Sequence, residues 1–179
     1  MEPRDDSGLV AAIGYEVRPS NAAQRFMQTI ASSRPGSWAF SKVLHHADRQ
    51  VFKLTKGRST VPTIVTGLPV VMVTTTGAKS GLDRTMPLLA IPVDGDLAII
   101  GTNFGQTSTP GWVFNLEADP HATVTYREHE VPVVARPADT DEYDTALAAA
   151  AKVYPGYDKY RERISGREVR VFVLETASE

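Results

Sequence analysis

VVMVTTTGAKSGLDRTMP, residues Val70–Pro87, contains two strand-like runs separated by a glycine-rich turn. The first run is apolar and β-branched as far as Thr75, which is typical of a buried strand, and the second run begins at Thr85. Lys79 and Arg84 lie at the rim of the turn, where they could bind an anion together with outward-pointing backbone N–H groups. An ordinary hairpin turn with solvated charges explains the same residues, and the stretch alone leaves both interpretations open.

Further hairpins follow this stretch. Asp94-Gly95-Asp96 is a tight-turn signal between apolar runs at 88–93 and 97–101, and a second hairpin is predicted over 122–135. A last strand is predicted over Glu168–Leu174. Short antiparallel strands with inserted helices indicate an α+β, barrel-like sheet. A Rossmann fold is not expected, because βαβ alternation and a G-x-G-x-x-G motif are both absent.

Helices are predicted between and before these strands. The segments with helical patterns or start signals are 21–32, Phe40–Leu54, Pro110–Glu117, Glu142–Val153 and 154–160. Asp139 and Glu142 form a capping-box pattern before the fourth of these. We therefore expect a flexible tail over residues 1–19, an N-terminal helical segment over 20–66 and a barrel domain over 67–179.

The predicted helix Phe40–Leu54 has one apolar face and a basic surrounding sequence. Such a helix can lie on an anionic membrane surface, or it can cover a core with its lysines in water. Covering the core is the favoured interpretation. The amino terminus has no signal-peptide pattern and no stretch is apolar for long enough to span a membrane, so a cytoplasmic protein is expected.

Composition excludes several classes of function. The chain of 179 residues has 42% apolar residues, enough for one domain with a real core, and its net charge of −2 argues against general nucleic-acid binding. The absence of cysteine removes thiol catalysis, disulfides and cysteine-ligated metals. His45 and His46 are adjacent on a predicted helix and so point apart, while His121 and His129 occupy turn regions, so no metal site is expected. A G-x-S-x-G elbow is also absent.

Two later stretches carry candidate chemistry. Asn103, Gly105 and Gln106 follow a predicted strand, where loops commonly hold ligands. Trp112 either stacks on a flat ligand or belongs to the core, and its neighbours favour the core. Three tyrosines at every third position share one helical face, where a hydroxyl in a dry pocket could donate to a developing oxyanion or simply cover a surface. These tyrosines are Tyr154, Tyr157 and Tyr160.

Taken together, residues 67–175 resemble the deazaflavin-dependent nitroreductase family of actinobacteria. The resemblance rests on four stretches in order, TTTGAKSG with Arg84 and Pro87 after it, GTNFGQ, PGWVFNLEADP and YPGYDKY. It implies a split β-barrel that binds coenzyme F420, an 8-hydroxy-5-deazaflavin with a phosphate and an acidic oligoglutamate tail. The reduced cofactor would deliver a hydride from C5. Lys53, Lys56 and Arg58 would suit the acidic tail.

The resemblance also assigns roles to individual positions. Tyr157 would orient or protonate the acceptor, Tyr154 and Tyr160 would line the substrate mouth, and Asn103 would lie near the reacting ring. Phe104 and Ala78 replace a lysine and an arginine of the nitroreductase, which leaves the phosphate to Lys79 and Arg84 and argues against nitroimidazole activation. The full set of predicted cofactor-binding residues is Thr76, Gly77, Lys79, Ser80, Arg84, Pro87, Asn103, Phe104, Gly105, Gln106 and Trp112.

We therefore expect an F420H2-dependent oxidoreductase that reduces a quinone, an α,β-unsaturated ester or lactone, or a nitroaromatic. Two alternatives stay open: an FMN-binding split-barrel oxidoreductase, and a non-catalytic F420 carrier. The expected partner is a small-molecule acceptor, without nucleic acid, in a monomer or a homodimer.

Overall fold

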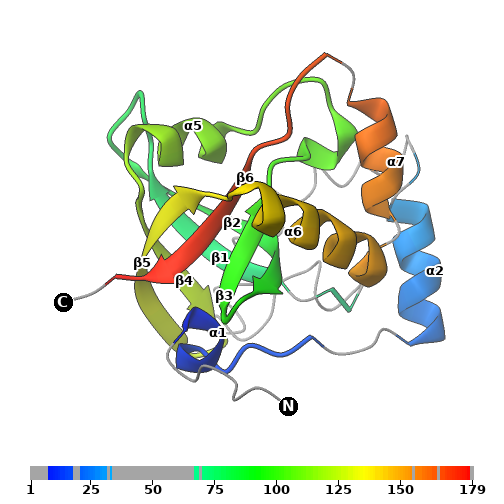
Figure 1. Ribbon diagram of the computed structural model, residues 1–179, viewed down its shortest axis with the longest axis horizontal. Coiled ribbons are helices and arrows are strands. Elements are labelled where there is room, and N and C mark those ends of the chain that lie inside the picture. Colours follow the sequence, from blue (N-terminus) through cyan, green and yellow to red (C-terminus); the bar gives the residue numbers. More distant parts are fainter. Residues whose placement is uncertain are drawn as a thin grey trace.

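The computed structural model describes residues 8–17, 21–31, 33, 67–68, 70–154, 156–164 and 166–177. Within this part of the chain, six antiparallel strands close into a barrel in the order β1–β2–β3–β6–β5–β4 (Figure 1). The predicted α+β split barrel is therefore confirmed. The strands are β1 Val70–Thr76, β2 Asp83–Val93, β3 Asp96–Ile100, β4 His121–Tyr126, β5 His129–Pro137 and β6 Val171–Thr176.

The opening stretch forms the hairpin of β1 and β2. Val73 pairs with Met86, and at the next position the hydroxyls of Thr74 and Thr85 lie 2.8 Å apart across the strands. β2 is longer than β1, and its second half pairs with β3, so that Ala90 lies opposite Ile99. The long second strand thus joins the first hairpin to the rest of the barrel.

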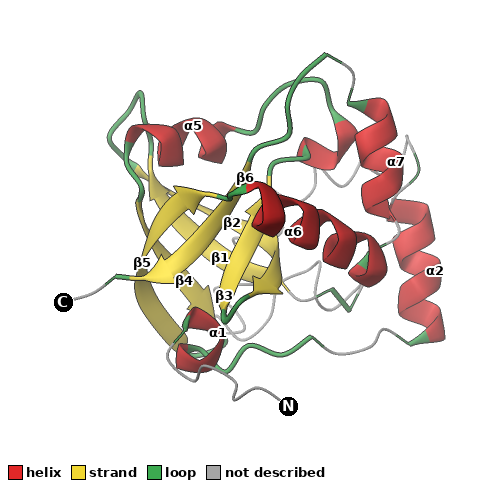
Figure 2. Ribbon diagram, viewed as in Figure 1, coloured by secondary structure: helices red, strands yellow, loops and turns green. Residues whose placement is uncertain are grey.

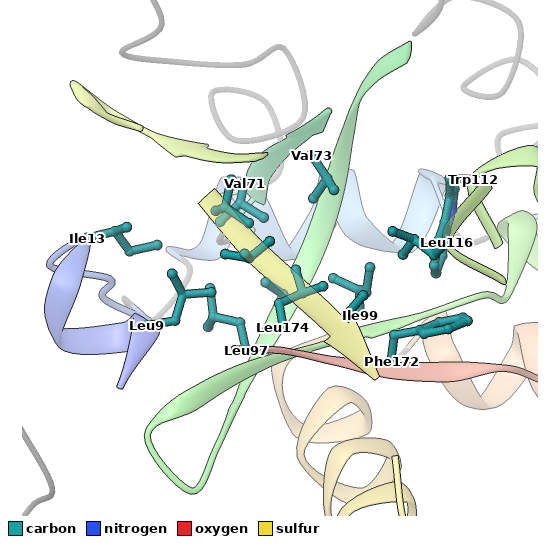
Figure 3. Close-up of a cluster of buried hydrophobic side chains, with 14 of the residues drawn as sticks. Leu9, Ile13, Val71, Val73, Leu97, Ile99, Trp112, Leu116, Phe172 and Leu174 are labelled. Atoms are coloured by element: carbon teal, nitrogen blue, oxygen red, sulfur yellow. The ribbon is translucent and has the colours of Figure 1, made fainter. Parts of the chain in front are cut away.

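Two apolar clusters stabilise the fold, one on each side of the strands. The first fills the barrel and includes Ala90, whereas the second includes its neighbour Ile91, because successive side chains of a strand point to opposite faces. Figure 3 shows the first cluster, with side chains from helices and strands meeting inside the barrel. The second cluster lies against the two C-terminal helices and contains the three predicted site tyrosines.

Helices cover the barrel from outside (Figure 2). The predicted capping box is present, since Asp139 Oδ1 accepts from the Glu142 N–H and Glu142 Oε2 accepts from the Asp139 N–H, both at 2.9 Å. The helices are α1 Leu9–Ala12, α2 Ala22–Ala31, the 3₁₀ turn η1 Asn103–Gly105, α5 Gly111–Ala118, α6 Thr140–Val153 and α7 Gly156–Arg163.

Residues 8–17 correct the prediction of a flexible tail. Leu9 and Ile13 are fully buried in the first cluster, and the Leu9 N–H donates to Asp96 Oδ1 at 2.9 Å. The hydroxyl of Tyr15 donates to the Ala90 carbonyl at 2.6 Å. This segment forms only one short helical turn, and the partners that hold it are distant in sequence.

The basic helix predicted over Phe40–Leu54, together with Lys53, Lys56 and Arg58, lies outside the described residues. In the part of the chain that the structure describes, none of the helices is both long and apolar enough to cross a membrane.

Candidate functional site

The turn between β1 and β2 presents positive side chains but not a free row of backbone donors. Lys79, Ser80 and Arg84 are exposed, and Arg84 Nη2 lies 3.5 Å from Ser80 Oγ. The N–H groups of Ser80 and Gly81 donate to the Gly77 carbonyl, and the Gly77 N–H donates to the Leu82 carbonyl. The prediction that these N–H groups point outward together is therefore wrong. An anion here would be held by side chains.

Helix α5 fixes this turn from inside the molecule. Asn115 is buried, and its side-chain oxygen accepts from the Ala78 N–H while its nitrogen donates to Thr75 Oγ1, both at 3.0 Å. A Cβ at Gly77 would lie 2.6 Å from Ser80 Oγ, so the turn is also closed tightly on itself. The positive side chains therefore stand on a rigid base. Thr76 and Pro87, also predicted as cofactor contacts, lie half-buried on the two flanking strands.

The second predicted loop follows β3 and has an unusual backbone. Asn103, Phe104 and Gly105 have φ angles of 48°, 55° and 76°, in the left-handed region. The Asn103 side chain donates to the Ser108 carbonyl at 2.9 Å and lies 3.1 Å from Ser108 Oγ. Gln106 is exposed. Asn103 therefore helps to shape its own loop.

The three tyrosines form one buried cluster at α7. Tyr154, Tyr157 and Tyr160 are each exposed by 6% or less, and the ring centroids of each pair lie 5.8–6.3 Å apart. The hydroxyls of Tyr154 and Tyr160 lie 3.0 Å apart and hydrogen-bond to each other. Both side chains are enclosed, and their predicted place at the substrate mouth stays a prediction.

Tyr157 differs from its two neighbours. Its hydroxyl has no hydrogen-bond partner among the described residues, although the side chain is almost fully buried. Burial raises the pKa of the Tyr157 hydroxyl, and the nearby Tyr160 raises it further. Tyr157 is therefore a neutral phenol with a free donor at any ordinary pH.

Trp112 lies inside the barrel rather than beside a ligand slot. It is 5% exposed, belongs to the first cluster, and its ring meets Phe172 edge-on at 6.1 Å. Of the two interpretations left open for Trp112, this position agrees with the favoured one, a core residue.

The two predicted ligand-binding segments lie at the same end of the barrel. β3 runs antiparallel to β2, so η1 emerges at the end where β2 begins. Ile99 lies opposite Ala90, so the chain leaves β3 beside the middle of β2, and the rest of β2 leads back to the charged turn at Asp83. On its other side, η1 lies against α7: the rings of Phe104 and Tyr160 meet edge-on at 6.4 Å. The loop and the tyrosine cluster therefore form one unit.

Sequence reasoning missed two arginines beside this unit. The Arg163 guanidinium lies 5.9 Å from the centre of the Tyr160 ring, and a Cβ at Gly105 would lie 3.3 Å from Arg163 Cδ. Arg167 donates to backbone carbonyls on both sides of η1. Both residues follow the YPGYDKY stretch, but neither belongs to a motif with a spacing that would indicate its target. Tyr15 was also missed: burial raises its pKa, and Tyr126 and Tyr157 contribute to that shift.

The chain is similar to known proteins in sequence and in structure. The family model described as F420H(2)-dependent quinone reductase matches residues 46–176. The F420H(2)-dependent quinone reductase of Mycobacterium tuberculosis is 33% identical over 79 residues, which cover 44% of this chain and 52% of that protein. The chain spans about half the length of the curated relatives it matches.

Solved structures share the fold. A structure of an F420-H2 dependent reductase, FDR-A, has 33% sequence identity and a TM-score of 0.54, covering 60% of this chain and 94% of that chain. A second structure, described as a domain-swapped dimer, has 29% identity and a TM-score of 0.57, covering 79% of this chain and 99% of that chain.

Proposed function

The chain belongs to the F420H(2)-dependent quinone reductase family, and from this premise we propose that it is an oxidoreductase that transfers a hydride from reduced coenzyme F420 to an electron-poor small molecule. The observation that carries the proposal is the Tyr157 hydroxyl, which has no hydrogen-bond partner among the described residues and lies on a helix that contacts η1. This arrangement supports a hydrogen-bond donor beside the loop where a reacting ring would lie.

The chemistry of the residues fits the proposed cofactor. Lys79, Ser80 and Arg84 offer two positive charges and a hydroxyl at an exposed turn, which suits a phosphate group. Asn103, Gly105 and the Phe104 ring offer a loop surface for the deazaflavin at the same end of the barrel. The two segments are different stretches of the chain at one end of the barrel, so a long cofactor could place its phosphate at one and its ring at the other.

Tyr157 acts on the acceptor in this proposal. Reduced F420, when bound, supplies the hydride. As the acceptor takes up the two electrons of the hydride, negative charge develops on its carbonyl or nitro oxygen. The neutral Tyr157 hydroxyl donates a hydrogen bond to that oxygen and lowers the energy of the charged transition state. Protonation of the oxygen, from Tyr157 or from water through it, completes the reduction.

Quinones are the first acceptor class to test, because the family is named for their reduction. The replacement of two positively charged residues of the nitroreductase by Ala78 and Phe104 is consistent with this order. Enones and nitroaromatics accept a hydride in the same way and complete the acceptor panel.

One experiment tests the proposal on the purified full chain. F420 is titrated while its fluorescence is followed, and reduced F420 is then mixed anaerobically with a quinone, an enone or a nitroaromatic. Saturable quenching followed by acceptor-dependent oxidation supports the proposal. A yellow protein that retains FMN and ignores F420 would contradict it. Tight F420 binding without turnover of any acceptor would also contradict it and would favour a carrier.

A further inference from the structure

Residues 103–105 hold a conformation that their sequence does not favour. Asn103 tolerates the left-handed region, but Phe104 does not do so easily, and both precede a glycine in the same region. Non-glycine residues keep such angles only where the surrounding structure over-determines them. Within the loop, the Gly105 N–H donates to the Thr102 carbonyl and the Gln106 N–H donates to the Asn103 carbonyl, both at 3.0 Å, so contacts from outside add to a turn that is already hydrogen-bonded.

Arg167 supplies these contacts at both ends of the loop. Its Nη1 donates to the Gly101 carbonyl at 3.0 Å, and its Nη2 donates to the Thr102 carbonyl at 3.0 Å and to the Gln106 carbonyl at 3.3 Å. Gly101 and Thr102 precede the left-handed residues, and Gln106 follows them. One planar guanidinium thus ties the entrance of the loop to its exit.

The geometry is specific to arginine. Three carbonyls receive hydrogen bonds from two nitrogens of one rigid fork, whereas a lysine ammonium is a single point on a flexible stem. The Asn103–Ser108 hydrogen bonds support the loop as well, but they lie within its own segment. Arg167, by contrast, bridges the two ends of the loop through one side chain.

We propose that Arg167 is a positioning residue that holds the Thr102–Gln106 loop in the conformation that receives the deazaflavin ring. This inference rests on the proposed function. Arg167 acts through the loop backbone and does not contact the acceptor. Its loss should therefore lower the fraction of molecules with a competent loop, without altering the donor at Tyr157.

The expected effect is on cofactor affinity. If the competent conformation falls to about a tenth of the population, the apparent Kd for F420 rises about tenfold. Saturating cofactor shifts the population back to the competent loop conformation. The kcat of the variant should therefore stay within about threefold of the wild-type value. A raised Kd with a nearly unchanged kcat distinguishes a positioning role from a general loss of folded protein.

The test compares Arg167→Ala and Arg167→Lys with Arg170→Ala as a matched control. Arg170 is three positions away and pairs with Glu117 and Glu168 at the surface. Circular dichroism checks folding, fluorescence titration gives the Kd for F420, and steady-state assays give kcat. Hydrogen exchange of the peptide over residues 101–110 reports loop opening without any cofactor. Millimolar guanidinium, far below denaturing concentrations, is added to test rescue of Arg167→Ala.

The inference predicts a raised Kd and faster exchange in both Arg167 variants, partial recovery with guanidinium for Arg167→Ala, and no change for Arg170→Ala. Unchanged exchange over residues 101–110 in folded Arg167→Ala would overturn it, and so would faster exchange with an unaltered Kd. If the wild-type protein does not bind F420 at all, the proposed function fails first. The exchange measurement would then still decide whether Arg167 holds the loop.

Discussion

Tyr157 has the two properties that a hydrogen-bond donor to a developing oxyanion requires, a protonated hydroxyl and no competing acceptor. Burial raises its pKa, and no described residue accepts its proton. Tyr154 and Tyr160, by contrast, hydrogen-bond to each other. The three residues have the same side chain, but the Tyr157 hydroxyl takes no part in the hydrogen bond that links the other two.

Tyr157→Phe should therefore lower kcat with little effect on the binding of F420. We expect a loss of about a hundredfold, in the range for a single positioned donor or acid. The Kd from fluorescence titration should stay within about twofold of the wild-type value, because in the proposed function the hydroxyl contacts the acceptor rather than the cofactor. Tyr143→Phe, on α6, is the matched control. Equal kcat values for the two variants would remove Tyr157 from the reaction.

Lys79→Ala should weaken F420 binding rather than turnover. The side chain is exposed, so the loss should be modest, about two- to fivefold in Kd at low salt, and it should shrink as salt screens the charge. Lys152→Ala, an exposed lysine in the last turn of α6, controls for the change in net charge. A Kd that responds equally to both substitutions would exclude a phosphate site at this turn.

At the scale of residues, the sequence predicted the charged turn and the tyrosine cluster. It did not predict which of their hydrogen-bonding groups are already paired. The GAKS residues predict an anion-binding turn, yet hydrogen bonds within the turn and to Asn115 occupy the backbone donors that the prediction needed. Every-third spacing places the three tyrosines together but cannot show which hydroxyls pair. Arg167 could not be predicted, because its targets are backbone carbonyls more than sixty residues earlier in the chain.

Helix α5 links the barrel core to the charged turn. Its buried side packs Trp112 and Leu116 into the first cluster, and Asn115, from the same helix, holds Ala78 and Thr75. The helix therefore transmits the rigidity of the core to Lys79 and Arg84, which have no buried anchor of their own.

Asn115→Ala should destabilise the protein by about 2 kcal/mol, because it leaves the Ala78 N–H and the Thr75 hydroxyl without their buried partner. Urea denaturation measures the change. Phe114→Ala is the control, since Phe114 is the preceding residue of the same helix and is 52% exposed. Because the turn loses its hydrogen bonds to Asn115, the Kd for F420 should rise as well. Equal stability of the two variants would show that Asn115 does not anchor the turn.

At the scale of elements, local signals predicted most of the fold. The Asp-Gly turn, the capping box and the apolar runs lie within a few residues of the structure they specify, and β3, α6 and β1 form close to the expected bounds. Segment 8–17 has no such local signal. Leu9 is fixed by a carboxylate and a barrel interior that lie far along the chain, so only the folded molecule shows that it is ordered.

In the whole molecule, the closed barrel separates segment 8–17 at one end from the candidate site at the other. Segment 8–17 contacts the β2–β3 turn through Gly95 and Asp96. The charged turn and η1 lie at the opposite end, with α5 beside the turn and α7 beside η1 (Figure 1). The candidate site thus depends on how firmly the helices are held to the barrel. For α6, an ionic network adds to the apolar packing of the second cluster.

Arg136 on β5 is the centre of this network. Its guanidinium donates to both carboxylate oxygens of Glu142, at 2.6 Å each, and its Nε donates to Glu175 on β6 at 2.6 Å. Glu142 also closes the capping box of α6. The network therefore joins the first turn of α6 to two adjacent strands, and α7 with Tyr157 follows α6 directly.

This network makes the free energy of unfolding depend on pH over a defined acidic range. Hydrogen bonds from Arg136 lower the pKa of Glu142 to about 2, from an ordinary value of 4.5. A carboxylate whose pKa is lower in the folded protein stabilises it fully above the unfolded pKa and loses that effect as the pH falls through the folded one. The contribution of Glu142 should thus be complete above about pH 5 and disappear progressively between about pH 4.5 and pH 2.

Glu142→Gln tests this dependence, because the amide can still accept from the Asp139 N–H but no longer carries the charge that Arg136 binds. At pH 7 we expect a loss of about 1–2 kcal/mol in the free energy of unfolding, a value reduced by the partial exposure of Arg136. Urea denaturation at a series of pH values should show the gap between wild type and variant closing as the pH falls below about 4.5. Asp144→Asn, an exposed change on the same helix, should show no such gap. A Glu142→Gln gap that stays constant down to pH 3 would mean that the ion pair does not attach α6 to the barrel, and the position of Tyr157 would then rest on apolar packing alone.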